Sequence, residues 1–455
     1  MIRLRRNKSL GRLYLTFLLC MVLSLAVFGY RVVTGSEITP MSDGQIIMNK
    51  KNCEFGKVYD RYNEVIAEGS TNSIIWASDQ TKQAFAEILG LDIESSLNAK
   101  TTLAGNTPWL YGTEVNNFSV YALTHPGSVR QGGSVRLTIS KELQEYVDAA
   151  VRKYGYENAY VVISNYQTGE LLCGYGDVFK AEMHPASTLK PVLTAAALSV
   201  NEDLQNFSYN CTKSNHIFQT ESGAYEIDCI NGTEHGVVNL SDAMACSCNG
   251  AFITIMRSVN RTDILAELKK WGFDTSISYS SEFQLWDHTF LQGSTSDSDF
   301  LLASIGQANA YITPAGLTMC TNILLNHGDL QTPVWFTEKQ ISQDEKWTEV
   351  DKAGSRAVCS AEVADKVVQM MQEVTARGTG TTFWLPGFVA KTGTAQKPST
   401  EEEDLNTVWV TGGLTNTETP YSITVSFDDV PKEVSSADAG NLAREILLHM
   451  TGGKE

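Results

Sequence analysis

Three short strings in the chain could together form an acyl-transfer site. Ser187 precedes Lys190 by three positions, Ser247 precedes Asn249 by two, and Lys391 opens a Lys-Thr-Gly-Thr string. Ser-x-Asn occurs six times in the chain and means little alone, whereas Ser-x-x-Lys and Lys-Thr-Gly occur once each. Their order and spacing together predict a serine nucleophile that a lysine activates.

Ser187 and Lys190 would share one face of a helix, because they are three residues apart. Pro191 is tolerated only near a helix start, so we expect the first turn near Ser187. The positive end of the helix dipole would then favour the negative charge that develops on an attacked carbonyl. Lys190 can act as a base only while its amine is neutral, and burial or the charge of Lys391 would lower its pKa. The alternative for this pair alone is a capping serine beside a surface lysine.

Ser247 and Asn249 would complete the proton path. The Ser247 hydroxyl could relay a proton to the leaving amine, and the Asn249 amide could hold Lys190 or the substrate backbone. An ordinary polar turn before a helix is the alternative interpretation.

Lys391 follows the strand-like run from Phe388 to Ala390, whose edge could bind an extended peptide. Gly393 would leave room for close approach, and Thr392 and Thr394 could bind a terminal carboxylate. The backbone N–H groups of Ser187 and Thr394 would form the oxyanion hole. A purely structural strand is the alternative.

The surrounding elements are predicted to be strands, then helices, then strands again. The expected strands cover 134–139, 159–164, 170–173, 388–390, 407–414 and 421–427. Glu142 to Lys153 shows helical spacing, the middle of the chain is mainly helical, and residues 274–300 are expected to form a loop. This order predicts an α+β fold with an antiparallel sheet and a helical subdomain.

Composition and charge limit the class of protein. The chain has 455 residues, enough for several domains. Its hydrophobic content of 42% and charged content of 19% are typical of folded proteins, and its formal net charge is −17. No basic patch is evident in the folded part, so we expect no nucleic-acid partner.

The N-terminus predicts a membrane anchor. A basic tail at 1–12 precedes an apolar run at 13–30, which favours an uncleaved single span with the N-terminus in the cytoplasm. A cleaved signal peptide is the competing interpretation. The Gly132-Gly133 pair then suggests a boundary between a small mixed α/β domain at 31–133 and a catalytic domain at 134–455.

The cysteines predict no metal site. No Cys-x-x-Cys pair or histidine cluster has zinc spacing, so we expect no structural metal and no cofactor. Cys211 and Cys229 could form a disulfide in an oxidising compartment, which the sequence leaves open. Cys248, inside the Ser-x-Asn string, is expected to pack as a small apolar residue.

These strings resemble those of penicillin-recognising serine acyltransferases, which carry Ser-x-x-Lys and Lys-Thr-Gly. Further matches to class B penicillin-binding proteins lie at 56–61 with 65–67, 137–139 with 143–144, 168–170, 306–307 with 313–314, 378–380 and Trp409. The chain most resembles the small penicillin-binding protein A type. It departs from the family pattern at Phe55, at the turn from Asp60 to Asn63, which lacks the usual glycine, and at Ala186, where glycine usually precedes the nucleophile.

The resemblance implies an α/β sandwich with a five-stranded antiparallel sheet, an all-helical subdomain, the site at their junction, and a pedestal or dimerisation-like domain at 31–133. It implies a D,D-transpeptidase whose Ser187 attacks the D-Ala-D-Ala amide of a peptidoglycan stem peptide. Lys190 would be the base, Ser247 the proton shuttle, and Lys391 with two threonines the carboxylate holder. β-Lactams would acylate Ser187, and a lipid-II polymerase of the shape, elongation, division and sporulation type would be a partner in the bacterial cell membrane.

Several related activities share the same strings. A serine β-lactamase needs a second base, for which the middle region shows no carboxylate motif, and a β-lactam sensor normally has several membrane spans. A D,D-carboxypeptidase differs only in using water as acceptor. The non-enzyme alternative is a division scaffold with a vestigial site. The residues leave open the acceptor amine and the choice among elongation, division and sporulation.

Overall fold

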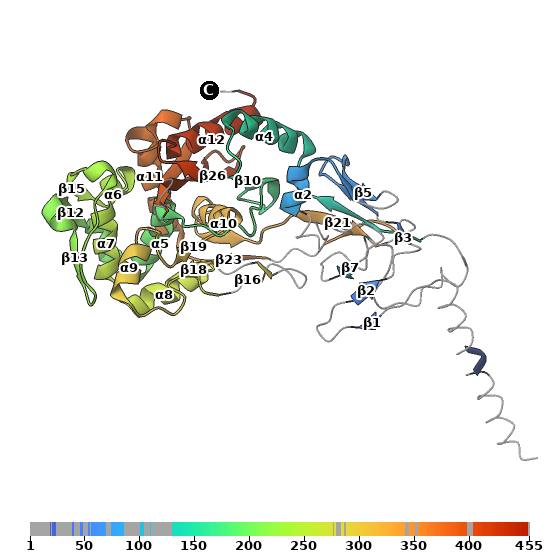
Figure 1. Cartoon of the computed structure of the whole chain (residues 1–455), viewed down its shortest axis with the longest axis horizontal. Coiled ribbons are helices and arrows are strands. Elements are labelled where there is room, and N and C mark those ends of the chain that lie inside the picture. The colour runs from blue at the N-terminus through green and yellow to red at the C-terminus, as the bar shows by residue number, and fades with distance from the viewer. Residues whose placement is uncertain are drawn as a thin grey trace, which may run out of the picture.

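The structure is a computed structural model of the whole chain (Figure 1). It describes residues 19, 21–23, 39–40, 46–48, 53–54, 56–69, 74–85, 101–103, 110, 130–275, 277–278, 284–285, 288–341, 345–350, 354–397 and 404–453. The predicted basic tail, nearly all of the predicted anchor, and Phe55 lie outside these residues. Within the described residues, no helix has the length and apolar character needed to cross a membrane.

A five-stranded antiparallel sheet forms the centre of the C-terminal part, as predicted. From edge to edge its strands are β11 (Leu171–Tyr175), β10 (Ala159–Asn165), β26 (Tyr421–Pro431), β25 (Leu405–Leu414) and β24 (Phe388–Gln396). The predicted hairpin is β10 and β11, with Val162 opposite Gly174. β24 carries the Lys-Thr-Gly string and lies at the edge, so one side of its backbone is not paired within this sheet.

Two helices cover one face of this sheet and lie side by side in Figure 1, α4 (Lys141–Tyr154) and α12 (Ser436–Met450). α4 begins where the Ser140 side chain accepts a hydrogen bond from the Leu143 N–H, 3.3 Å away. Its buried stripe shares one core with buried residues of α12 and of the sheet, among them Val147, Leu442 and Val425.

The opposite face packs against α10 (Pro314–Leu325) and α11 (Ala361–Arg377), and the turn that leads into α5 (Lys190–Val200) contacts β24. Leu193 of α5, Val374 of α11 and Trp409 of β25 belong to the same core. The sheet is therefore buried on both faces, and the start of α5 lies beneath β24.

The subdomain between β11 and β24 is mainly helical, with α6 (Leu240–Ala245), α7 (Asn249–Ser258), α8 (Arg261–Lys270) and α9 (Asp297–Ala303). It also carries short antiparallel ribbons, so it is not all-helical. Among them, β12 (Ser208–Cys211) pairs with β15 (Gly236–Asn239), and β13 (Ile217–Thr220) pairs with β14 (Gly223–Glu226). These four-residue strands have mostly exposed side chains, which gives them little apolar alternation for a sequence pattern to detect.

The expectation of a loop over 274–300 is wrong at its end, where α9 begins. Ser296 caps α9 by accepting a hydrogen bond from the Asp299 N–H at 3.3 Å, and Phe300 and Leu301 are buried. The same Ser and Asp residues that suggested a loop form the helix cap.

A second sheet joins distant parts of the chain. Its order is β22 (Thr348–Glu349), β21 (Phe336–Gln340), β9 (Ser134–Leu137), β4 (Lys57–Tyr59), β5 (Val65–Gly69) and β6 (Ile74–Trp76). Strands from both sides of the predicted boundary at residue 133 pair directly, since β4 runs parallel to β9. One sheet thus contains strands from both sides of residue 133, and the division into two domains at that residue stays a prediction.

The turn from Asp60 to Asn63 explains how the chain does without the usual glycine. Asn63 has φ 70°, and asparagine tolerates this left-handed region better than most residues. The Asp60 carboxylate accepts hydrogen bonds from the Tyr62 and Glu64 N–H groups, both at 2.8 Å.

The remaining elements are short. They are β1 (Thr39–Pro40), β2 (Ile46–Met48), β3 (Cys53–Glu54), α2 (Asp79–Phe85), β7 (Thr101–Leu103), β8 (Arg130–Gln131), η2 (Ala186–Leu189), η3 (Glu202–Asn206), η4 (Lys213–His216), η5 (Ile230–Gly232), β16 (Ile277–Ser278), β17 (Gln284–Leu285), β18 (Thr289–Phe290), β19 (Ala310–Tyr311), β20 (Asp329–Gln331), β23 (Ser355–Ala357) and η6 (Thr381–Phe383).

Candidate active site

Ser187 lies in η2, the 3-10 turn that leads directly into α5. Pro191 falls in the first turn of α5, which agrees with the predicted helix start. Ser187 is half-buried, whereas most of α5 is fully buried. The residue before it, Ala186, has φ 50°, a left-handed conformation that explains why a glycine would fit this position.

Lys190, one turn after Ser187, is fully buried and points at the Ser-x-Asn string. Its Nζ donates hydrogen bonds to the Ser247 carbonyl oxygen at 2.8 Å, the Ser247 Oγ at 3.2 Å and the Asn249 Oδ1 at 2.8 Å. The ring of Phe252 lies 5.0 Å from the same nitrogen. Burial lowers the pKa of Lys190 to about 8, so a useful fraction of its amine is neutral near neutral pH.

Ser247 lies between α6 and α7 with φ 57°, in the left-handed region. Its backbone and side-chain oxygens both contact Lys190. Asn249, at the first position of α7, also donates through Nδ2 to the Asp228 carbonyl oxygen at 2.8 Å. The turn thus places the side chains of Ser247 and Asn249 within hydrogen-bonding distance of the Lys190 amine.

Lys391 reaches the same hydroxyl from β24, which lies against η2. Its Nζ donates to the Ser247 Oγ at 3.0 Å and to the Thr392 carbonyl oxygen at 2.9 Å. Burial, followed by the charge of Lys190, lowers the pKa of Lys391 well below its ordinary value. The sequence predicted burial or the charge of Lys391 as the cause of a lowered pKa at Lys190, and burial is the main cause.

Gly393 allows β24 to approach η2 closely. A Cβ atom at this position would lie 2.9 Å from the Thr188 Cγ2 and 3.0 Å from the Pro185 carbonyl oxygen. Thr394 follows on the same strand and is half-buried. The N–H groups predicted for the oxyanion hole, those of Ser187 and Thr394, therefore belong to two elements in contact, and their role stays a prediction.

The side chains of Thr379 and Phe252 contact the site, but the sequence assigned a site role to neither, although Thr379 lies within the family match at 378–380. The Thr379 Oγ1 lies 2.5 Å from the Thr392 Oγ1, and the preceding Gly378 packs so tightly that a Cβ there would lie 2.2 Å from the Ala245 carbonyl oxygen. Phe252 follows Asn249 by three positions on α7, a helical spacing that could have placed it beside Lys190.

The family comparison agrees with this geometry. Residues 159–448, more than half of the chain, match the penicillin binding protein transpeptidase domain. The chain belongs to the penicillin-binding protein transpeptidase family. The match begins at β10 and ends in α12, so this transpeptidase domain contains the sheet and all three strings.

Individual relatives are distant. A protein of Mesostigma viride named peptidoglycan D,D-transpeptidase FtsI homolog is 24% identical over 292 residues, which cover 58% of this chain and 48% of the relative. The chain thus spans about half the length of this curated relative.

Solved structures show the same fold. Penicillin-binding protein A of Mycobacterium tuberculosis matches with a TM-score of 0.71 at 17% identity, over 87% of this chain and 98% of that one. Penicillin-binding protein 3 of the same organism, in complex with aztreonam, matches with a TM-score of 0.69 at 20% identity, over 88% and 96%. The five-stranded sheet with helices on both faces is therefore the transpeptidase fold.

Proposed function

We propose that this chain is a peptidoglycan D,D-transpeptidase that cross-links stem peptides through an acyl-enzyme on Ser187. The observation that carries the proposal is that two buried lysines, Lys190 at the start of α5 and Lys391 on β24, both donate a hydrogen bond to the Ser247 hydroxyl. The names of the relatives agree with it, as does the family match.

Acylation follows from this arrangement. The neutral amine of Lys190 accepts the hydroxyl proton as the Ser187 Oγ attacks the carbonyl carbon of the penultimate D-Ala. The N–H groups of Ser187 and Thr394 stabilise the oxyanion. The C–N bond then breaks, Ser247 passes a proton from Lys190 to the departing D-Ala amine, and the acyl group remains on Ser187.

Substrate binding would change which of the two lysines, Lys190 or Lys391, carries the positive charge. The terminal carboxylate of the stem peptide, held by Thr392, Thr394 and Lys391, favours the charged form of Lys391. A protonated Lys391 next to Ser247 then disfavours a second charge on Lys190. Carboxylate recognition would thereby leave Lys190 neutral at the moment when a base is needed.

Deacylation distinguishes this function from hydrolysis. In the described residues, the hydrogen bonds of both lysine nitrogens go to Ser247, Asn249 and Thr392, and none goes to a carboxylate. A β-lactamase needs such a second base for its water. An amine from a neighbouring stem peptide is a stronger nucleophile and would resolve the acyl-enzyme with Lys190 as its base.

The apolar run at 13–30 supports a single membrane anchor, which would hold the catalytic domain outside the bacterial cell membrane beside its polymeric substrate. A lipid-II polymerase of the shape, elongation, division and sporulation type would supply that substrate. β-Lactams, which resemble D-Ala-D-Ala, would acylate Ser187 and block the enzyme.

The test is cross-linking of nascent peptidoglycan. The full chain in detergent would be mixed with uncross-linked glycan strands that carry pentapeptides, and muropeptides would be separated by mass spectrometry. We expect cross-linked dimers with the parent and none with Ser187→Ala. Release of D-Ala without dimers would instead indicate a carboxypeptidase, and no change in either product would favour a scaffold.

A further inference from the structure

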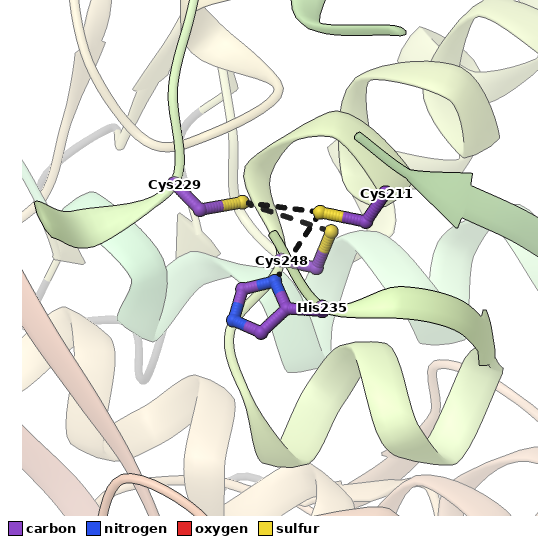
Figure 2. A group of neighbouring side chains, drawn as sticks. All are labelled: Cys211, Cys229, His235 and Cys248. Atoms are coloured by element: carbon purple, nitrogen blue, oxygen red, sulfur yellow. Dashed lines mark hydrogen bonds between the residues drawn. The ribbon is translucent and has the colours of Figure 1, made fainter. Parts of the chain in front are cut away.

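Three cysteine sulfurs and a histidine ring meet behind the Ser-x-Asn turn (Figure 2). Cys211 ends β12, Cys229 precedes η5, His235 precedes β15, and Cys248 is the middle residue of the Ser-x-Asn string. Their four donor atoms all lie within 4.8 Å of one another. The three cysteines are buried and the histidine is half-buried.

The separations fit a tetrahedral metal site better than a disulfide. The Cys211 and Cys229 sulfurs are 3.9 Å apart, and the Cys229 and Cys248 sulfurs are 3.8 Å apart. Tetrahedral zinc with Zn–S bonds of about 2.3 Å places its sulfur ligands about 3.8 Å from one another. A disulfide requires about 2.05 Å, which neither pair approaches.

The histidine completes the set. The Nδ1 of His235 lies 3.3 Å from the Cys211 sulfur, close to the roughly 3.5 Å expected between nitrogen and sulfur ligands of zinc. Three thiolates and one imidazole form a common ligand set for structural zinc, and soft sulfur ligands favour zinc over magnesium or calcium.

We propose that Cys211, Cys229, His235 and Cys248 bind one zinc ion in a closed tetrahedral site. The three thiols lose their protons to solvent as the Zn–S bonds form, so no oxidant is required. The fourth bond comes from the His235 nitrogen, which leaves no position open for water. The site is therefore structural rather than catalytic.

A second histidine supports the site from outside. His216 is fully buried, and its Nε2 lies 3.3 Å from the Cys211 sulfur while its Nδ1 lies 3.1 Å from the Asp228 Oδ1. To bond both the Asp228 carboxylate and the Cys211 thiolate, the ring needs an N–H at each nitrogen, which the imidazolium form provides. Such outer hydrogen bonds orient metal ligands and strengthen metal binding.

The zinc would link the turn at 247–249 to the ribbon of β12 and β15. Cys248 lies between Ser247 and Asn249, and Asn249 already donates a hydrogen bond to the carbonyl of Asp228, the residue before Cys229. A metal bond through Cys248 would hold the left-handed turn at Ser247 in place. The sequence predicted no structural metal because these ligands are spread from β12 to α7 without a Cys-x-x-Cys pair.

The test is the zinc content of the full chain, purified in detergent without chelator and measured by inductively coupled plasma mass spectrometry. We expect about one zinc per chain for the parent, and less than about a tenth of that for Cys211→Ser and Cys229→Ser. The matched control is Cys320→Ser, a fully buried cysteine whose sulfur contacts the Trp271 carbonyl oxygen instead. It should keep its zinc.

Because cysteine variants can unfold, the parent itself provides a second measurement. After removal of metal by a chelator under reducing conditions, added zinc should restore about one ion per chain and raise the unfolding temperature. Zinc retained by both cysteine variants would overturn the proposal. So would a metal-free parent in which alkylation and peptide mass spectrometry reveal a Cys211–Cys229 disulfide.

Variants of the two histidines distinguish the proposed zinc ligand, His235, from the proposed outer hydrogen-bond partner, His216. His235→Ala should weaken zinc binding more than about 100-fold in competition with a chelator, whereas His216→Gln should weaken it about 10-fold. The reverse order would contradict the assignment of His235 as the fourth ligand. None of these readouts depends on the activity of Ser187.

Discussion

At the scale of single residues, the site depends on where two ammonium groups lie. The Nζ atoms of Lys190 and Lys391 contact the same Ser247 hydroxyl, at 3.2 and 3.0 Å, and both side chains are fully buried. Two buried like charges on one hydroxyl disfavour each other, so the pair releases a proton more readily than an exposed lysine does. A lysine that has lost its proton is neutral and can act as a base.

The rate of acylation should therefore depend on pH. The pKa of Lys190 is lowered to about 8, and only the neutral amine can accept the Ser187 proton. We expect the acylation rate with a fluorescent penicillin to rise roughly tenfold per pH unit below this pKa and to level off above it. A rate that falls as the pH rises towards 8 would contradict Lys190 as the base; circular dichroism at each pH checks folding.

Replacement of the proposed base, Lys190, by arginine should strongly lower the acylation rate. Lys190→Arg keeps the positive charge but cannot lose a proton in a protein, so acylation should fall by about 10³-fold. Stopped-flow fluorescence with the same penicillin measures this loss. The matched control is Lys366→Arg, on the exposed side of α11, which should acylate at the parental rate. Near-parental acylation by Lys190→Arg would show that another group is the base.

Ala186 offers a prediction about stability. Its φ of 50° is unfavourable for any residue with a Cβ atom, and Ala186→Gly would remove that strain. We expect the free energy of unfolding to rise by about 0.5–1 kcal/mol despite the added freedom of the unfolded chain. Thermal and denaturant unfolding measure the change. In contrast, Ala195→Gly, inside α5, should lower stability by about 1 kcal/mol, and a loss of stability with both variants would refute the strain.

At the scale of elements, the site requires the edge strand β24 to lie against η2. Gly393 favours this contact, because a Cβ there would lie 2.9 Å from the Thr188 Cγ2 and 3.0 Å from the Pro185 carbonyl oxygen, so the neighbours would have to shift. The same strand places the Lys391 Nζ 3.0 Å from the Ser247 Oγ. In the proposed mechanism it also supplies Thr392 and Thr394, so a small displacement of this one strand would disturb carboxylate binding and oxyanion stabilisation together.

Gly393→Val tests this contact. The side chain should move β24 away from η2 and lower the acylation rate by at least about 10²-fold, since placement of the reacting groups is lost. Penicillin acylation is again the measurement, with circular dichroism to show that the sheet is retained. Gly354→Ala, where a Cβ meets open space, is the control and should acylate normally. Unchanged acylation by Gly393→Val would mean that the strand position is not critical.

The elements were predictable from sequence to the extent that their patterns are local. The β10–β11 hairpin, α4 and the three late strands have clear alternation or helical spacing, and all are present. The ribbon of β12 and β15 was missed, because its short strands are mostly exposed and their partners are far apart in the chain. The Cys–His cluster was missed for a similar reason, since this ribbon and the turn at Cys248 bring it together.

At the scale of the whole molecule, two cores enclose the sheet, and the residues packed around the site, such as Leu189 and Phe252, belong to one of them. One core unites α4 and α12 with one face, and the other unites the opposite face with α5, α10 and α11. The chain order places Ser187 before the helical subdomain and Lys391 after it, so the antiparallel return of β24 is what brings the three strings together. The motif geometry was predictable because the family pattern implies that return. Burial was predicted as one cause of a lowered Lys190 pKa, whereas the full burial of both lysines is known only from the packed structure.

The most direct test of the central claim is intact-mass spectrometry of the full chain in detergent after incubation with a penicillin, beside Ser187→Ala and Ser199→Ala. Ser199 is an exposed serine on the same helix, α5, and serves as the matched control. We expect a persistent mass increase of one penicillin on the parent and on Ser199→Ala, and none on Ser187→Ala. An adduct that persists on Ser187→Ala, or penicillin hydrolysis by the parent without any adduct, would contradict a stable acyl-enzyme on Ser187.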